Sequence, residues 1–136
     1  MKTVITKCEN ETLNIAGEFA KTVKKGDIIA LFGTMGMGKT VFVRGFAQGL
    51  GLSARVSSPT YAIVHEYASD LVHFDMYRIQ GEDDLYSTGF YDYLDMGRTI
   101  VIEWSEKIED VLPQGTKKIL IEPGESENSR RITFSD

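Results

Sequence analysis

The sequence predicts an α/β fold in one domain, with a mainly parallel sheet that carries antiparallel additions. Residues 28–32 and 99–102 are almost wholly apolar, and such runs are typical of strands buried on both faces of a parallel sheet. Residues 117–122 and 130–134 also have strand character, and the proline–glycine pair after the first of them predicts a hairpin, which is an antiparallel addition. Because 136 residues suit one compact domain, we expect the whole chain to fold as one unit.

Helices are expected between these strands, which gives the alternation that a parallel sheet needs. Asn10 has the residue type of a helix N-cap, and apolar residues recur at helical spacing after it. A second amphipathic helix is predicted over residues 40–50. The other predicted elements are, in chain order, a short strand at 3–6, strands at 61–67 and 71–75, and one or two short helices over 82–94, broken near Gly89.

The composition excludes several classes of protein. Fifteen Lys and Arg against twenty Asp and Glu give a net charge of −5. This argues against a protein that binds nucleic-acid phosphates through an overall positive charge. Cys8 is the only cysteine, which excludes an intramolecular disulfide and a cysteine-rich zinc site. Residues 1–136 lack an apolar stretch suited to a membrane span or a secretory signal. We therefore expect a cytoplasmic protein with no membrane partner.

The most informative segment is residues 33–40, Gly-Thr-Met-Gly-Met-Gly-Lys-Thr, which fits the pattern G-x-x-x-x-G-K-[ST]. Its three glycines allow backbone N–H groups to point inward around a phosphate, helped by the positive end of the following helix. Lys39 would bridge phosphate oxygens, and the Thr40 hydroxyl would bind Mg²⁺. An apolar strand before the segment and an amphipathic helix after it disfavour a chance glycine turn. The sequence therefore predicts a nucleotide-phosphate site in a P-loop NTPase-like three-layer sandwich.

Two carboxylates at strand ends are candidates for binding the metal and for activating water. Asp75 ends the predicted strand 71–75, and Glu103 follows the apolar run 99–102. The carboxyl ends of buried strands are where ligands collect in such sheets, and a P-loop enzyme needs a carboxylate there for Mg²⁺ or its waters. Spacing alone does not separate the two roles: one carboxylate would bind Mg²⁺ while the other orients or deprotonates the attacking water.

Other polar and aromatic residues near these strands have less specific signals. Thr60 closes a hydroxyl-rich segment that predicts either a switch loop sensing a γ-phosphate or a plain turn. His65 and His73 lie in strand patterns without metal-ligand spacing, which predicts structural roles. Trp104, next to Glu103, either fills core space or borders the site, where it would report nucleotide binding by fluorescence.

ATP is favoured over GTP, because neither a D-x-x-G turn nor an [NT]-K-x-D base reader follows the phosphate loop. Two alternatives to an ATPase stay open: a small-molecule kinase, although no lid-like insertion is visible, and a binding module that changes shape without turnover. Residues 82–110 contain nine acidic and two basic side chains, a net charge of −7. This segment predicts either a solvated face or a docking surface for a basic partner.

Five motifs occur along the chain in a specific order: the loop at 33–40, Phe-Val-Arg-Gly at 42–45, Ser-Pro-Thr-Tyr at 58–61, His-Phe-Asp-Met-Tyr-Arg at 73–78 and Ile-Glu-Trp at 102–104. In this combination the chain closely resembles the bacterial TsaE (YjeE) family, the ATPase component of tRNA threonylcarbamoyladenosine synthesis. The family's loop more often reads Gly-Asp-Leu-Gly-Ala-Gly-Lys-Thr. The replacements here, Thr34, Met35 and Met37, leave the phosphate-binding glycines, the lysine and the threonine intact.

The resemblance implies a small cytoplasmic ATPase, with ATP and Mg²⁺ as cofactors, that is weakly active alone and works with the TsaD and TsaB proteins. Its ATP cycle would reset the TsaD–TsaB complex between rounds of threonylcarbamoyl transfer to tRNA, and tRNA would be reached only through that complex. The implied catalytic residues are Lys39, Asp75, Glu103 and Thr60, and the implied metal residues are Thr40, Glu103 and Asp75. The implied nucleotide-binding residues are Gly33, Met35, Gly36, Met37, Gly38, Lys39, Thr40 and Val41, with Glu9, Thr12 and Arg130 toward the adenine.

Overall fold

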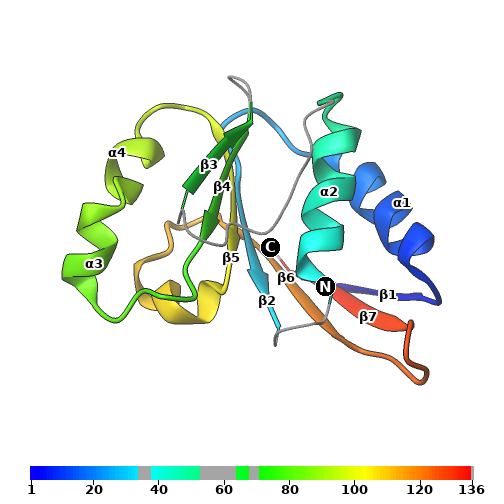
Figure 1. Cartoon of the computed structure of the whole chain (residues 1–136). Helices are drawn as coiled ribbons and strands as arrows, with labels where there is room; N and C mark the ends of the chain where they lie inside the picture. Colours follow the sequence, from blue (N-terminus) through cyan, green and yellow to red (C-terminus); the bar gives the residue numbers. More distant parts are fainter. Residues whose placement is uncertain (34–37, 53–63, 68–70, 136) are drawn as a thin grey trace.

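The computed structural model describes residues 1–33, 38–52, 64–67 and 71–135, in which a seven-stranded sheet lies between two layers of helices (Figure 1). The strands are β1 (Lys2–Thr6), β2 (Ile28–Phe32), β3 (Val64–Tyr67), β4 (Leu71–Asp75), β5 (Thr99–Glu103), β6 (Lys117–Pro123) and β7 (Arg130–Ser135). The helices are α1 (Glu9–Ala20), α2 (Lys39–Gly49), α3 (Glu82–Ser87), α4 (Phe90–Leu94) and the 3₁₀ helix η1 (Ser105–Val111). Within these described ranges no helix has the length and apolar character that a membrane crossing requires.

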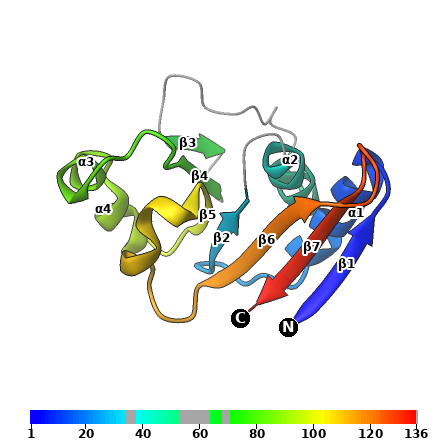
Figure 2. The ribbon, with the colours of Figure 1, turned by 90° about the horizontal axis from the view of Figure 1, so that it is seen from below.

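The four central strands of the sheet are parallel. The strand order is β1-β7-β6-β2-β5-β4-β3, and β6, β2, β5 and β4 all run in the same direction. β7 pairs antiparallel with both β6 and β1, and β3 pairs antiparallel with β4; Figure 2 shows β6, β7 and β1 side by side at one edge. The predicted parallel sheet with antiparallel additions is confirmed, including the hairpin formed by β6 and β7.

Side chains of the central strands alternate between two hydrophobic cores. Ile29 and Leu31 of β2 and Val101 of β5 belong to the core beneath α1 and α2, whereas Ile100 and Ile102 belong to the core beneath α3, α4 and η1. Because successive strand residues point to opposite faces, this alternation buries β2 and β5 on both sides. Figure 1 shows α1 and α2 on one side of the sheet and α3 and α4 on the other, which confirms the three-layer arrangement.

The first helix begins two residues earlier than the sequence indicates, so the prediction of Asn10 as its N-cap is wrong. The N-cap is Cys8, which has an extended backbone and makes no side-chain cap hydrogen bond. Instead, the Lys7 N–H donates to Glu11 Oε1 at 2.8 Å. A carboxylate that accepts a backbone N–H at this end of a helix also interacts favourably with the helix dipole, so Glu11 supports the earlier start.

α1 and α2 approach each other through glycine. A Cβ atom on Gly45 of α2 would lie 2.5 Å from the Leu13 carbonyl oxygen of α1, and one on Gly49 would lie 2.5 Å from the Gly17 carbonyl oxygen. Both neighbours are backbone atoms, which cannot move aside without shifting the helix. This contact fixes the position of α2, whose first residue is Lys39.

Gly45→Ala is therefore expected to destabilise the fold by about 1–3 kcal/mol, the usual cost of forcing an extra carbon into a packed interface. Urea or thermal unfolding measures the change. Gly81→Ala is the matched control, because its backbone is extended and no heavy atom lies within 4 Å of the added Cβ. Equal unfolding midpoints for the two variants would contradict this account of the helix contact.

Candidate functional site

The site is built around the N-terminus of α2, shortly after β2 in the chain. Gly33 follows β2 with φ 139°, and a Cβ atom there would lie 2.4 Å from the Ile121 carbonyl oxygen of β6. Gly38 is the N-cap of α2 and has φ 91°. Only glycine adopts these backbone angles without strain, so two glycines of the expected phosphate loop are explained by their conformation. Thr40 lies half-buried in the first turn of α2.

Lys39 is the first residue of α2, and its ammonium group is enclosed. The residue is 5% exposed, its Nζ donates to the Gly33 carbonyl oxygen at 2.6 Å, and the same atom lies 3.6 Å from the centre of the Trp104 ring. A cation over an indole face is stabilised by the ring quadrupole. Burial lowers the pKa of Lys39, and three nearby carboxylates, with Glu106 the strongest, act in the opposite direction.

Asp75 and Glu103 lie side by side at the ends of β4 and β5, where they are partners in the strand register. Glu103 is 3% exposed, and its Oε2 lies 2.6 Å from Nε2 of His73. His73 precedes Asp75 by two residues on β4, so both side chains point to the same face. Both acids contribute to the electrostatic field at Lys39. The structure therefore brings together the lysine and the two carboxylates that the sequence singled out.

The surroundings of Asp75 disfavour the charged form of its carboxyl group. Its Oδ1 accepts the Tyr77 N–H at 2.9 Å. The pKa of Asp75 is nevertheless raised, chiefly because burial removes water from the carboxylate and also because of the negative charge of Glu103. The Tyr77 N–H and the positive charge of Lys39 oppose this rise.

Asp75→Asn is expected to raise the thermal unfolding midpoint of the ligand-free protein at neutral and higher pH. The raised pKa means that the folded state keeps the Asp75 proton more tightly than the unfolded state, so this group's contribution to stability falls as pH rises from about 3.8 through the folded pKa. Asparagine carries no charge and its Oδ1 still accepts the Tyr77 N–H. Thermal unfolding of both proteins is followed by circular dichroism at about pH 8 and about pH 4. The midpoint of Asp75→Asn should exceed that of the unmodified protein by more at the higher pH. A midpoint for Asp75→Asn below that of the unmodified protein at the higher pH would contradict this prediction.

Glu106, Trp104 and His73 make three contacts at the site in addition to those of the predicted site residues. Glu106 of η1 accepts the Gly33 N–H on its Oε2 at 2.8 Å. Trp104 borders the site, where its ring lies against Lys39, and it also packs against the core on the α3–α4 side of the sheet. Its backbone is left-handed, with φ 59°. His73 was expected to be structural, yet it binds Glu103 directly. Of the three residues, only Glu106 had no signal in the sequence: Trp104 directly follows Glu103, and the two-residue spacing puts His73 on the same strand face as Asp75.

A small pocket lies beside Gly38, on the side of α2 that faces α1 and β7. Residues from separate parts of the chain line it: Glu9, Thr12, Gly38, Val41, Asn128 and Arg130. All but Asn128 are residues implied for nucleotide binding. They meet because β1 and β7 are paired with Thr6 opposite Arg130, which places the start of α1 next to the start of β7. Four other expected site residues, Met35, Gly36, Met37 and Thr60, lie outside the described residues.

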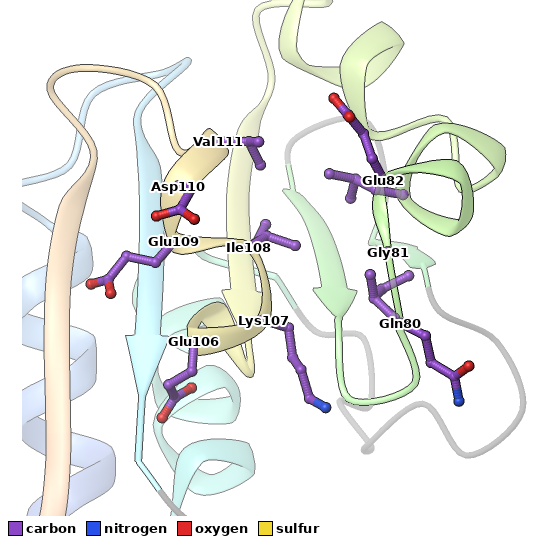
Figure 3. A pocket seen from close by; sticks show the side chains of 11 residues that line it. Gln80, Gly81, Glu82, Glu106, Lys107, Ile108, Glu109, Asp110 and Val111 are labelled. Carbon is purple, nitrogen blue, oxygen red and sulfur yellow. The ribbon is translucent and has the colours of Figure 1, made fainter.

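A second hollow, of about 640 Å³, lies between α3 and η1 (Figure 3). Its lining includes four acidic residues, Glu82, Glu106, Glu109 and Asp110. All four belong to the acidic segment 82–110. Two of these carboxylates have partners already: Glu106 accepts the Gly33 N–H, and Glu109 lies 3.8 Å from the ammonium group of Lys118.

The oxygen donors near the start of α2 fit a magnesium ion that binds together with a nucleotide. They fit less well a metal ion bound by protein side chains alone. No group of three or more His, Cys, Asp and Glu side chains that would hold a metal occurs among the described residues. Magnesium in nucleotide sites keeps several waters and takes only one or two ligands from the protein, with the rest from phosphates. A threonine hydroxyl and the two carboxylates at the ends of β4 and β5 match that limited donor set.

Comparisons with known proteins agree on one family. The family model described as "Threonylcarbamoyl adenosine biosynthesis protein TsaE" matches residues 6–132. The chain is 39% identical over 128 residues to the "tRNA threonylcarbamoyladenosine biosynthesis protein TsaE" of Bacillus subtilis, which covers 92% of this chain and 79% of that protein. It is 39% identical over 108 residues to the protein of the same name in Rickettsia typhi, covering 76% and 74% of the two chains.

The fold agrees with a solved structure as well. The crystal structure of YdiB from Bacillus subtilis matches with a TM-score of 0.79 and 34% sequence identity, over 98% of this chain and 83% of that chain. The match of the family model extends over almost the whole sequence, and its range includes Lys39, Asp75 and Glu103. The chain therefore belongs to the TsaE family.

Proposed function

We propose that this protein is a magnesium-dependent ATPase of the machinery that makes threonylcarbamoyladenosine in tRNA. The observation that carries the proposal is the buried Lys39 ammonium at the start of α2, placed opposite the adjacent carboxylates of Asp75 and Glu103. A cation and two acids at the carboxyl edge of a parallel sheet are the parts that phosphoryl transfer needs. The names of the curated relatives supply the biological setting.

In the proposed site, the N-terminus of α2 binds the phosphates. The backbone around Gly38 and the side chain of Lys39 provide positive charge, and the dipole of α2 adds to it. Lys39 would exchange its hydrogen bond with the Gly33 carbonyl for phosphate oxygens. The pocket formed by Glu9, Thr12, Val41, Asn128 and Arg130 would receive the nucleoside end of ATP.

The two carboxylates would divide the remaining tasks. Thr40, with Asp75 or Glu103, would hold the magnesium ion, which neutralises charge on the phosphates when it is bound. The other carboxylate would orient the attacking water and accept its proton. Glu103 is the better candidate for the water, because its burial and its hydrogen bond to His73 fix the carboxylate in one orientation.

The proposed partners are the TsaD and TsaB proteins, with tRNA contacted only through their complex. The net charge of −5 supports indirect contact, because a protein that binds tRNA by itself usually presents a basic surface. In this scheme, ATP turnover resets the TsaD–TsaB complex between rounds of transfer. The protein would act in the cytoplasm, where tRNA is modified.

Steady-state ATP hydrolysis tests the proposal. The purified protein is assayed with Mg²⁺, first alone and then with a TsaD–TsaB complex from the same source. Weak hydrolysis that rises with the complex supports a partner-driven ATPase. A hydrolysis rate that is unchanged by the complex but rises with a small hydroxylated acceptor would show a kinase instead. ATP binding without hydrolysis, both alone and with the complex, would show a binding module.

A further inference from the structure

We propose that His73 is a positioning residue for Glu103: its imidazole holds one oxygen of the Glu103 carboxylate and thereby directs the other toward the water or magnesium ion at the start of α2. The inference rests on the function proposed above for Glu103. It assigns a role to a residue that the sequence pattern presented as structural. It also identifies what keeps a charged group fixed in the interior of this sheet.

The pair is buried and close. His73 is 0% exposed and Glu103 3% exposed, and Nε2 of His73 lies 2.6 Å from Oε2 of Glu103. A carboxylate removed from water at this depth is costly unless it is hydrogen-bonded. A hydrogen bond of this length to an ionised oxygen is among the stronger ones in proteins. The pair is therefore unlike an exposed ion pair, whose geometry is weakly held.

The other ring nitrogen shows which way the hydrogen bond runs. Nδ1 of His73 is buried and has no hydrogen-bond partner among the described residues. A hydrogen on Nδ1 would leave a donor unsatisfied in the interior, whereas a bare nitrogen there leaves only an unused lone pair. The favoured tautomer thus carries its hydrogen on Nε2, which donates to Glu103 Oε2. Oε1 is then the oxygen that serves the reaction.

The ring itself is held in place from the neighbouring strand. Tyr67 of β3 stacks on His73 with ring centres 6.1 Å apart and planes 27° apart. In the register of β4 with β5, His73 is opposite Val101, and Asp75 is opposite Glu103. The imidazole therefore reaches diagonally along the sheet to the acid at the strand end. A rigid partner of this kind is what fixes a catalytic or metal-binding group in its productive orientation.

Two substitutions separate positioning from packing. His73→Phe keeps an aromatic ring against Tyr67 but removes the hydrogen-bond donor. His73→Gln removes the ring but places an amide N–H near the position of Nε2. If His73 positions Glu103, the glutamine variant works and the phenylalanine variant does not. If His73 only fills space, the order is reversed.

The readouts are the Mg²⁺ dependence of ADP binding, followed through Trp104 fluorescence, and kcat and KM for ATP. We expect His73→Phe to weaken the apparent Mg²⁺ affinity or to lower kcat by about 10–100-fold, the usual effect of losing a partner behind a metal-site ligand. His73→Gln should stay close to the unmodified protein in both. The KM for ATP should change little in either variant. The proposed phosphate-binding groups are the Lys39 side chain and the N-terminus of α2, and neither substitution alters them.

His65→Phe is the matched control, because His65 lies opposite His73 on β3 and its ring also contacts Tyr67; it should behave as the unmodified protein. A His73→Gln variant that folds but loses activity as severely as His73→Phe would overturn the inference. It would equally be overturned by full activity in His73→Phe. Should His73→Phe fail to fold, a His73→Gln variant close to the unmodified protein in kcat and Mg²⁺ affinity supports the inference. A His73→Gln variant that folds but loses about tenfold or more in either quantity overturns it.

A measurement without nucleotide keeps this inference separate from the proposed function. Long-range ¹H–¹⁵N NMR of the imidazole in the ligand-free protein identifies its tautomer. We expect the hydrogen on Nε2, with resonances that shift in Glu103→Gln. A hydrogen on Nδ1 with none on Nε2 would overturn the inference, because Nε2 could not then donate to Glu103. Absence of Mg-ATP binding in the unmodified protein would instead overturn the proposed function, whatever the tautomer.

Discussion

Lys39→Ala is expected to weaken ATP binding by more than about tenfold and to lower ATP hydrolysis with it. Lys39 supplies the one buried ammonium that the described residues place at the start of α2. Charge-assisted contacts of this kind cost about 2–5 kcal/mol when one partner is truncated, and 1.4 kcal/mol corresponds to a tenfold change in affinity. ATP affinity should therefore fall by more than about tenfold. Calorimetric titration with ATP and Mg²⁺ measures the loss directly.

Lys25→Ala is the control for the change in net charge, because Lys25 is exposed in the turn between α1 and β2. It should bind ATP as the unmodified protein does. Thermal melts of both variants are needed as well, since Lys39→Ala also leaves three carboxylates without the ammonium group among them. A folded Lys39→Ala variant that binds ATP normally would remove the basis for placing phosphates at this helix.

Glu103→Gln is expected to separate ATP binding from ATP hydrolysis. Glutamine has the same shape, and its side-chain oxygen still accepts a hydrogen bond from His73, so the strand end should keep its structure. The neutral amide neither accepts a proton from water nor balances a metal charge. Loss of a general base typically lowers kcat by about 10²–10⁴-fold. ATP affinity should change far less, because the phosphates would still meet Lys39 and the helix N-terminus.

Single-turnover assays and ATP titrations of this variant give the two quantities separately. Glu125→Gln is a suitable control: it makes the same chemical change on an exposed residue of the turn between β6 and β7. Hydrolysis at the normal rate in Glu103→Gln would transfer the water-activating role to Asp75. A loss of ATP affinity as large as the loss of hydrolysis would make Glu103 a binding residue rather than a catalytic one.

The parts of the site on regular strands could be predicted from the sequence. The apolar run before Glu103 indicates a strand buried on both faces, and the end of such a strand in a parallel sheet meets the ends of its neighbours. Asp75 and Glu103 are therefore adjacent for a reason visible in the pattern, and the register confirms it. The place of Lys39 follows in the same way, because the loop pattern is followed by a helix. The helix was predicted over residues 40–50 and begins one residue earlier, at Lys39.

The contacts made by η1 could not be predicted in this way. The chain reverses at Trp104, a non-glycine residue with positive φ, and such a conformation is set by tertiary packing rather than by residue type. The reversal places the Trp104 ring under the Lys39 ammonium and brings Glu106 to the Gly33 N–H. The pocket at Arg130 likewise depends on the pairing of β1 with β7, which joins the two ends of the chain.

The most direct test of the central claim is the number of threonylcarbamoyladenosine modifications made per TsaD–TsaB complex when this protein, ATP and Mg²⁺ are supplied. We expect many rounds per complex with the unmodified protein and a single round with Glu103→Gln, because the variant would bind ATP without completing the cycle. Repeated rounds with Glu103→Gln, at the rate of the unmodified protein, would contradict the claim that ATP turnover at this site drives the reset.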